Sequence, residues 1–223
     1  MTVFDGVIFD MDGVIVDTEH LWEQSWTVSA ALRGYTWTAH DTSTVQGMSA
    51  PEWSAYVADR AEVPEQAETI RAECVKFMVD KVVEGEGPLL PGAADLVHAV
   101  ADRTRIAVAS SAARAVIEVV LAKHGLTDRF TAICSSEEVP LGKPAPDVYL
   151  EAARRLGLDP TRAIGIEDSS NGMRAAHAAG LTLVALPNKS YPPKPDAVAL
   201  AAYVASTHDD ARDYIIARLV AAM

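Results

Sequence analysis

The sequence predicts an α/β fold: a parallel β-sheet covered by helices on both faces, with an all-helical segment inserted after the first strand. Beyond about residue 88, short apolar runs alternate with helical patterns, which is typical of βαβ units. Between about residues 17 and 87 there are helical patterns but no strand-like run. We therefore expect a core domain formed by residues 1–16 and 88–223, and a helical domain formed by residues 17–87.

The core strands are predicted from apolar runs of the length typical of buried strands. The first run covers residues 3–10 and ends at a carboxylate, and the others cover residues 105–109, 132–134, 163–166 and 181–186. Core helices are expected over residues 92–102, 114–124, 147–156, 172–179 and 209–222. The last helix would place Ile215, Ile216, Leu219 and Val220 on one side, which favours packing against the sheet.

The inserted segment is predicted to contain helices near residues 21–32, 51–61 and 64–83. It holds all the tryptophans of the chain, which we expect to form its core: Trp22, Trp26, Trp37 and Trp53. Five histidines of the chain show no metal-ligand spacing, so we expect surface or helix-capping positions for His40, His98, His124, His177 and His208.

Composition narrows the class of protein. The 223 residues include 19 Lys and Arg against 31 Asp and Glu, a net charge of −12 that argues against nucleic-acid and membrane partners. Cys74 and Cys134 lie far apart and form no CxxC, so we expect buried thiols rather than a disulfide or zinc site. The sequence shows no basic, apolar leader and no apolar run of about 18 residues, which predicts a cytoplasmic protein.

Two acids follow the first predicted strand. Asp10 and Asp12 are separated by one residue, which would place both carboxylates on the same side as the chain leaves the sheet, and Gly13 permits a tight turn. The alternative is a turn with solvated acids, because Asp is common in turns. However, an apolar strand that ends at two acids puts them where ligands bind parallel sheets, at the carboxyl ends of the strands.

Polar residues also follow the next three strands. Ser110 and Ser111 end the second strand, Lys143 lies between a glycine and a proline after the third, and Glu167 and Asp168 end the fourth. Each alone has a simpler explanation: a helix N-cap for the serines, a surface lysine, and helix capping by the acids. Together, carboxylates that suit Mg²⁺, a lysine and a hydroxyl form a set sufficient for phosphoryl transfer.

The four clusters, in this order, resemble the motifs of the haloacid dehalogenase superfamily, in the subgroup with a helical cap that includes β-phosphoglucomutase and many small-molecule phosphatases. The matching segments are Phe9-Asp10-Met11-Asp12-Gly13-Val14-Ile15-Val16-Asp17-Thr18, then Ser110, then Gly142-Lys143-Pro144-Ala145-Pro146-Asp147, and finally Glu167-Asp168-Ser169-Ser170-Asn171-Gly172. The likeness covers essentially the whole chain. It implies a Rossmann-like core with the helical segment as its cap.

This resemblance implies roles for the acids. Asp10 would be the nucleophile that becomes an aspartyl-phosphate, and Asp12 would be the general acid for the leaving group and then the base for the attacking water. Mg²⁺ would be held by Asp10, the backbone carbonyl of Asp12, and Asp168. Glu167 would bind the ion directly or stand just behind its ligands. The name-giving dehalogenases lack the second aspartate, so Asp12 argues against dehalogenation.

The resemblance also implies that Ser110, Ser111 and Lys143 bind the transferring phosphoryl group, with Lys143 orienting the nucleophile. The cap would close over the site and control the access of water. Its substrate loop resembles Gly47-Met48-Ser49-Ala50-Pro51-Glu52. Candidate substrate contacts are Glu19, Gly47, Met48, Ser49, Arg114 and Asn171. Alternatively, Gly47 and Ser49 only start the helix at Pro51.

The sequence departs from the β-phosphoglucomutase pattern where the mutase grips a second phosphate. Ala50 stands in place of an arginine, and Ala112 and Ala113 stand in place of a serine and a lysine. Trp22 aligns with a mutase histidine, although His20 is close. Alanine does not replace the bidentate grip of arginine, so these departures favour a phosphatase that acts on a monophosphate.

The leading prediction is therefore a Mg²⁺-dependent phosphatase of a small organic phosphomonoester, such as a sugar phosphate. The alternative is a sugar phosphomutase in which Arg114 or Lys76 replaces the missing grip. A third hypothesis is a non-catalytic phosphate-binding protein, against which the intact pair Asp10 and Asp12 argues. The resemblance implies a monomer.

Overall fold

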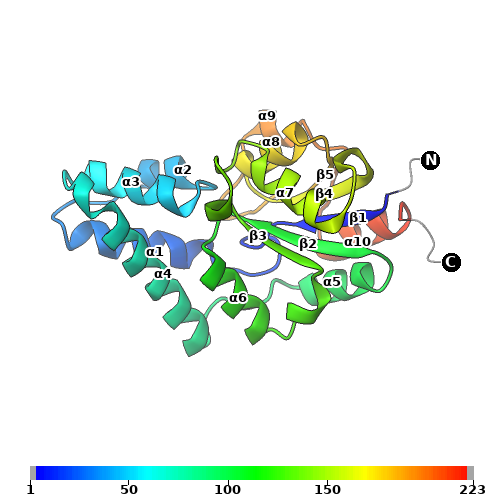
Figure 1. Cartoon of the computed structure of the whole chain (residues 1–223), viewed down its shortest axis with the longest axis horizontal. Helices are drawn as coiled ribbons and strands as arrows, with labels where there is room; N and C mark the ends of the chain where they lie inside the picture. Colours follow the sequence, from blue (N-terminus) through cyan, green and yellow to red (C-terminus); the bar gives the residue numbers. More distant parts are fainter. Residues whose placement is uncertain (1–3, 220–223) are drawn as a thin grey trace.

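The computed structural model describes residues 4–219. Its described residues form one parallel sheet of six strands in the order β3-β2-β1-β4-β5-β6. The strands are β1 (Gly6–Phe9), β2 (Arg105–Ser110), β3 (Ala132–Ser135), β4 (Ala163–Glu167), β5 (Thr182–Ala185) and β6 (Tyr203–Val204). Helices cover both faces of the sheet, and a helical insert follows β1 (Figure 1). The predicted fold class is confirmed; the short β6 was not predicted.

The central strand β1 is buried on both faces, which explains its continuous apolar sequence. Val7, Ile8 and Phe9 are fully buried. Because side chains alternate along a strand, Val7 and Phe9 join the apolar core on one face of the sheet and Ile8 joins the core on the other. The strand pairs with β2 on one side and with β4 on the other.

Three helices cover each face of the sheet. The face of Val7 carries α5 (Ala93–Ala101), α6 (Arg114–Lys123) and α10 (His208–Ile216). The face of Ile8 carries α7 (Asp147–Leu156), α8 (Ser170–Ala178) and α9 (Pro195–Val198), as Figure 1 shows. The last predicted helix is shorter than expected: α10 ends at Ile216, and Leu219 instead forms a bridge with Phe4 beside β1. Val220, with the rest of that prediction, lies outside the described residues.

His208 corrects one expectation. We expected it at the surface or as a capping residue, but it is buried at the first turn of α10. Its Nε2 lies 2.7 Å from the carbonyl oxygen of Val14. The ring thus joins α10 to the turn after β1, a contact between segments that are distant in sequence.

The helical insert consists of α1 (Glu19–Ala31), α2 (Ala39–Val45), α3 (Ala50–Arg60) and α4 (Ala67–Glu84). Its four tryptophans pack against one another, with ring centroids about 6 Å apart, as expected for its core. Helix α2 was not predicted. Its signal in the sequence is the capping box formed by Thr38 and Asp41, in which each side chain bonds to the backbone of the other residue.

The sheet has a topological switch point at β1. The chain continues from β1 through the insert to β2 on one side of β1, and the later strand β4 lies on its other side. The carboxyl ends of these strands therefore meet at one edge of the sheet, where parallel sheets bind ligands. In Figure 1 the insert lies beyond this edge. Within residues 4–219, no helix combines the length and apolarity needed to cross a membrane.

The capping box of α2 is open to a direct stability test. Thr38 is exposed, so Thr38→Ala removes the cap without leaving a cavity. We expect the free energy of unfolding to fall by about 1 kcal/mol, which corresponds to a Tm lower by about 2–4 °C for a chain of this size. The control is Thr27→Ala, because exposed Thr27 bonds only to the Glu23 carbonyl within α1. Equal Tm values for both variants would contradict the assignment.

Candidate active site

Asp10 lies at the carboxyl end of β1, in the middle of the sheet. The residue is 6% exposed, and its Oδ1 accepts a hydrogen bond of 2.8 Å from the Lys143 ammonium. Burial and the neighbouring Glu167 carboxylate raise the pKa of Asp10 well above its ordinary range, against the opposing effect of Lys143. A buried carboxylate with one free oxygen at a strand end is a suitable nucleophile.

The turn after Asp10 approaches another acid closely. Gly13 has φ of +78°, a conformation that favours glycine, and a Cβ at this position would overlap the Asp168 carboxylate. The backbone of the turn and the end of β4 therefore share one small space. This close approach explains why a glycine directly follows Asp12.

Lys143 is the buried cation of the site. It is 2% exposed, and its ammonium donates to Asp10 Oδ1 and, at 2.6 Å, to Glu167 Oε1. Burial lowers the pKa of Lys143, but the two carboxylates outweigh this effect and raise it above its ordinary value. The lysine therefore remains charged and ties the ends of β1 and β4 together.

Both oxygens of Glu167 are occupied by protein donors. Its Oε1 accepts from Lys143 and from the Tyr149 hydroxyl at 2.6 Å. Its Oε2 accepts from the backbone N–H groups of Asp168 and Ser169 and from the Ser169 hydroxyl, at 3.1–3.2 Å. A Cβ at position 172 would overlap this carboxylate, which explains the glycine at the start of α8. Glu167 is thus held rigidly behind the other acids.

Asp168 is different. Its Oδ2 accepts a bond of 3.2 Å from Asn188, whereas its buried Oδ1 has no hydrogen-bond partner within residues 4–219. Burial and three nearby carboxylates raise the pKa of Asp168 well above its ordinary range. A buried oxygen without a partner is costly, so it points to a bound group that completes the site.

The donor set of the site suits a hard divalent cation. One oxygen each from Asp10, Glu167 and Asp168 lies within 4.8 Å of the others. Asp12 and Glu19 add two more carboxyl groups nearby, against the single ammonium of Lys143. Such an excess of buried negative charge is unfavourable without a cation, and oxygen-only ligands are those that Mg²⁺ prefers.

The two serines after β2 have different contacts. Ser110 is fully buried, and its hydroxyl accepts from the backbone N–H of Ala112 and lies 3.4 Å from Asp12 Oδ2. The Ser111 hydroxyl donates at 2.7 Å to the carbonyl oxygen of Gly47 in the insert. Ser110 therefore faces Asp12, and Ser111 joins the core to the insert.

Asp12 is bonded mainly to the insert. Its Oδ1 accepts from the Thr18 hydroxyl at 2.5 Å and from the Trp22 indole N–H at 3.0 Å. Burial raises the pKa of Asp12 above its ordinary value, although these donors oppose the shift. The carboxylate is thus oriented by the first turn of α1.

A small cavity of roughly 50 Å³ lies between the sheet edge and the insert. Its floor includes Asp10, Asp12 and Lys143, and its walls include Trp22, Trp26 and Trp53. Lys143 is the only Lys or Arg among the described residues that line it. The cavity therefore combines acidic and aromatic walls with one cation at its base.

The comparisons with known proteins now identify the family. Residues 4–180 match the family described as haloacid dehalogenase-like hydrolase. The chain belongs to this family. It is 32% identical over 186 residues to hexitol phosphatase B of Escherichia coli K12, a match that covers 81% of this chain and 82% of the relative. The predicted resemblance is confirmed, and the protein is an enzyme of the hydrolase class.

Solved structures of this family agree with the fold. CbbY from Rhodobacter sphaeroides, in complex with phosphate, matches with a TM-score of 0.81 and 28% identity, covering 92% of this chain and 95% of CbbY. β-Phosphoglucomutase from Clostridium difficile matches with a TM-score of 0.80, covering 96% of this chain and 100% of the mutase. Its identity of 23% supports likeness of fold alone.

The predicted contacts from the insert divide into two groups. Glu19, Gly47 and Met48 line the cavity. Ser49 does not: its hydroxyl bonds to Glu52, and the pair caps α3. Asn171 also lies outside the cavity lining, because its amide donates to the Gln46 carbonyl oxygen at 2.9 Å.

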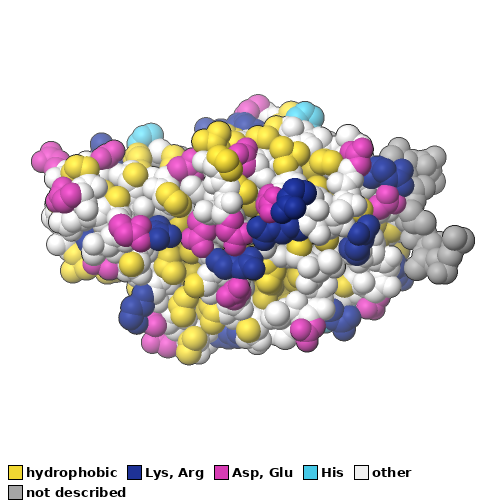
Figure 2. Space-filling model, in the orientation of Figure 1, with side chains coloured by type: hydrophobic (Ala, Val, Ile, Leu, Met, Phe, Trp, Pro, Cys, Tyr) yellow, Lys and Arg dark blue, Asp and Glu magenta, His cyan; other side chains and the backbone are white. Residues whose placement is uncertain are grey.

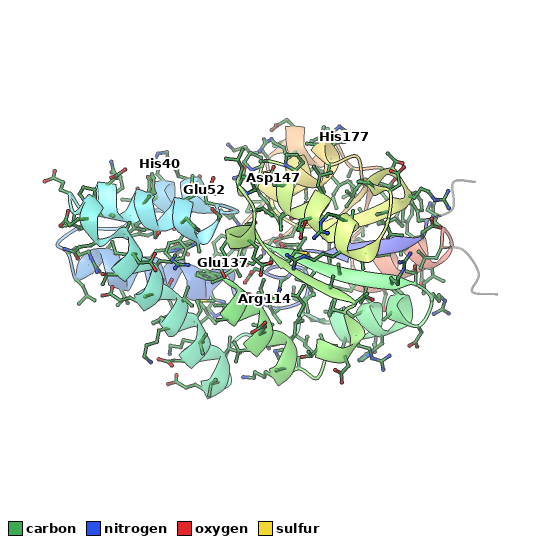
Figure 3. The ribbon with its side chains drawn as sticks, viewed as in Figure 1. His40, Glu52, Arg114, Glu137, Asp147 and His177 are labelled. Atoms are coloured by element: carbon green, nitrogen blue, oxygen red, sulfur yellow. The ribbon has the colours of Figure 1, made fainter. Side chains whose placement is uncertain are left out.

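Arg114 does not reach the cavity, which corrects the expectation of a substrate contact. Its guanidinium pairs with Glu118 at 2.8 Å and with Glu138 at 3.3 Å. Figure 3 shows Arg114 beside Glu137, at the junction of insert and core. Figure 2 shows basic and acidic side chains gathered there, where Arg71 of α4 pairs with Glu137. The Arg114 guanidinium is thus held by these carboxylates and by the Ile133 carbonyl oxygen, away from the cavity.

Several residues of the hydrolase site were missed. The Tyr149 hydroxyl on Glu167, the Thr18 hydroxyl on Asp12 and the Asn188 amide on Asp168 were not predicted. Trp22 was expected in the core of the insert, but it also bonds to Asp12. The signal for Thr18 was its place within the first motif. Tyr149 and Asn188 carry no local signal, because their partners are distant in sequence.

The buried Glu19 predicts a pH dependence of stability. Burial, and then the Asp12 carboxylate, raise the pKa of Glu19 from 4.5 to about 8. Between these pH values the folded protein holds a proton that the unfolded chain has lost, so the free energy of unfolding falls as pH rises. The contribution of Glu19 is at most about 1.4 kcal/mol per pH unit.

Glu19→Gln should therefore lose less stability than the unsubstituted protein between pH 5 and pH 8. The measurement is urea unfolding of metal-free protein in a chelating buffer. Glu65→Gln is the control, because Glu65 is exposed in the turn before α4. Parallel pH profiles for Glu19→Gln and the unsubstituted protein would show that Glu19 does not hold this proton.

Proposed function

We propose that this hydrolase is a Mg²⁺-dependent phosphatase that acts on a small organic phosphomonoester through an aspartyl-phosphate intermediate. The observation that carries the proposal is that three acids meet at one sheet edge. Asp10 is held by Lys143, Asp168 has a buried oxygen without a partner within residues 4–219, and Asp12 lines the same cavity as Asp10. Sugar and polyol monophosphates are the first candidate substrates, in view of the likeness to hexitol phosphatase B.

Asp10 would attack the phosphorus atom, and Lys143 would hold its other oxygen in place. Asp12 would give a proton to the leaving alcohol and then take one from the water that hydrolyses the phosphorylated Asp10. Ser110 and Ser111, at the end of β2, would receive the phosphoryl oxygens together with Lys143. Phosphoryl transfer needs positioning and neutralisation of charge, and these groups supply both.

Asp10, the Asp12 carbonyl oxygen and Asp168 would hold Mg²⁺. The ion would neutralise the charge that develops on the phosphoryl group. Glu167 would support these ligands from behind, because protein donors already occupy both of its oxygens. This assignment separates the two neighbouring acids at the end of β4: Asp168 binds the ion directly, and Glu167 fixes Lys143.

The helical insert, residues 17–87, would act as a cap that opens to admit substrate. The cavity beneath it is too small for a sugar phosphate. Hydrogen bonds between the insert and the core include Ser111 to Gly47, Asn171 to Gln46, and Tyr191 to Glu23. A few such bonds at an interface can break and reform during turnover.

The cavity favours a phosphatase over a phosphomutase, which must grip two phosphates. Within the described lining, Lys143 is the only Lys or Arg, and it is already bonded to two carboxylates. Arg114 pairs with surface acids, and Lys76 pairs with Asp80 on an exposed face of α4. Neither residue replaces the missing grip.

The proposal is tested by measuring phosphate release from a panel of sugar and polyol monophosphates and p-nitrophenyl phosphate, with and without Mg²⁺. We expect Mg²⁺-dependent release, and a loss of at least about 10³-fold in kcat for Asp10→Asn because the nucleophile is removed. Full activity of Asp10→Asn would exclude the covalent mechanism. Exchange of hexose 1- and 6-phosphates without release would indicate the mutase, and tight binding without turnover a phosphate-binding protein.

The metal assignment has its own test. Asp168→Asn should raise the Mg²⁺ concentration needed for half-maximal phosphate release by at least about tenfold, because it removes a charged ligand. Asp128→Asn is the matched control, since Asp128 is exposed and lies far along the chain from the cluster. An unchanged Mg²⁺ requirement for Asp168→Asn would refute the direct role of Asp168.

A further inference from the structure

We propose that Asn188, in the turn that follows β5, is a positioning residue for the metal site. It holds one oxygen of the Asp168 carboxylate and so keeps the other oxygen free for the ion. The inference rests on the proposed function, in which Asp168 is a metal ligand. Its basis is a hydrogen bond of 3.2 Å from Asn188 Nδ2 to Asp168 Oδ2.

The Asp168 carboxylate depends on this one bond. Within residues 4–219, no other group donates to its Oδ2, and its buried Oδ1 has no partner. The neighbouring Glu167 differs, because several protein donors occupy both of its oxygens. A carboxylate can turn about its Cβ–Cγ bond, so a single donor on Oδ2 also decides where Oδ1 lies. Partners of this kind commonly orient the carboxylates that bind metal ions.

The register of the sheet brings the turn beside Asp168. Strand β5 pairs in parallel with β4, with Ala185 opposite Glu167. The Leu186 N–H then continues this pairing by donating to the Glu167 carbonyl oxygen at 2.7 Å. Asn188 follows two residues later, where both chains leave the sheet. The position of Asn188 is thus set by the pairing of two strands.

The orientation of the Asn188 amide is fixed by its own turn. Its Oδ1 accepts from the backbone N–H groups of Ser190 at 2.9 Å and Tyr191 at 3.2 Å. An amide has one acceptor oxygen and one donor nitrogen, so an occupied oxygen leaves the NH₂ group for Asp168. A Cβ at Gly13 would lie 3.2 Å from this nitrogen. The glycine therefore leaves room for the amide as well as for the carboxylate.

A second side chain anchors the same turn elsewhere. The Tyr191 hydroxyl donates at 2.9 Å to Glu23 Oε2 in the insert. The turn therefore has one side-chain bond to the metal site and another to the insert, and each can be removed separately. Tyr191→Phe loosens the turn but leaves the bond between Asn188 and Asp168, which makes it the matched control.

The test measures the rise in Tm that added Mg²⁺ causes in the metal-free protein, because an ion that binds the folded state stabilises it according to its affinity. Asn188→Ala should need about tenfold more Mg²⁺ for the same rise. Tyr191→Phe should keep the original Mg²⁺ response. The Tm without Mg²⁺ is not the readout, so a less stable turn does not imitate the effect.

Asn188→Ser is a second variant that decides the question if Asn188→Ala does not fold. A serine hydroxyl can accept the same bonds within the turn, but it is one bond shorter and loses the contact with Asp168. We expect it to need more Mg²⁺ than the unsubstituted protein, as Asn188→Ala does.

A double substitution shows whether Asn188 acts through Asp168. In a protein that already carries Asp168→Asn, adding Asn188→Ala should weaken Mg²⁺ binding much less than it does alone, because the carboxylate that it holds is gone. Equal effects in the two backgrounds would overturn the positioning role. An unchanged Mg²⁺ response in both Asn188 variants would also overturn it, as would a Tyr191→Phe response shifted as far as theirs.

These results would leave the proposed function intact, provided that Asp168→Asn alone still raises the Mg²⁺ requirement for phosphate release. Failure of the proposed function gives a different result. The unsubstituted protein would then show neither a rise in Tm with Mg²⁺ nor Mg²⁺-dependent phosphate release, and both proposals would be overturned.

Discussion

The Lys143 ammonium, buried between Asp10 and Glu167, is the interaction on which the rest of the site depends. It joins the ends of two neighbouring strands, β1 and β4, through bonds of 2.8 and 2.6 Å. Leaving either carboxylate buried without this partner would be strongly unfavourable. The parallel sheet makes the pairing possible, because it brings the carboxyl ends of both strands to the same edge. The Tyr149 hydroxyl and backbone N–H groups then hold Glu167 so that it cannot turn away.

One lysine does not neutralise the acids around it, and this imbalance explains most of the chemistry that we propose. Burial raises the pKa values of Asp10, Asp12 and Asp168, and repulsion by neighbouring carboxylates raises those of Asp10 and Asp168 further. A divalent cation would relieve the repulsion, and Asp168 Oδ1 is a buried oxygen that has no hydrogen-bond partner within residues 4–219. The same excess of negative charge disfavours a second phosphate, since the cavity lining offers it no free cation. The proposed metal binding and the proposed preference for a monophosphate thus rest on one charge distribution.

The helical insert contributes to the site as well as covering it. Its first helix begins at the residue that bonds to Asp12, and its tryptophans form both its own core and the cavity wall. The insert contacts the core through polar bonds and also through apolar packing, because its buried side chains belong to the same apolar cluster as those of α6.

The sequence by itself determined the fold class, the order of the elements and the residues at the strand ends. These features depend on local patterns: apolar runs set the strands, and polar residues that end them must lie at one edge of a parallel sheet. It did not predict α2 or β6, which are short and add little apolar periodicity. It also placed Arg114 near the substrate, because adjacency to Ser110 says nothing about which surface acids attract a guanidinium. The contacts of Tyr149, Asn188 and Trp22 were decided only by the tertiary structure, since each joins residues whose separation in sequence hides their closeness in space.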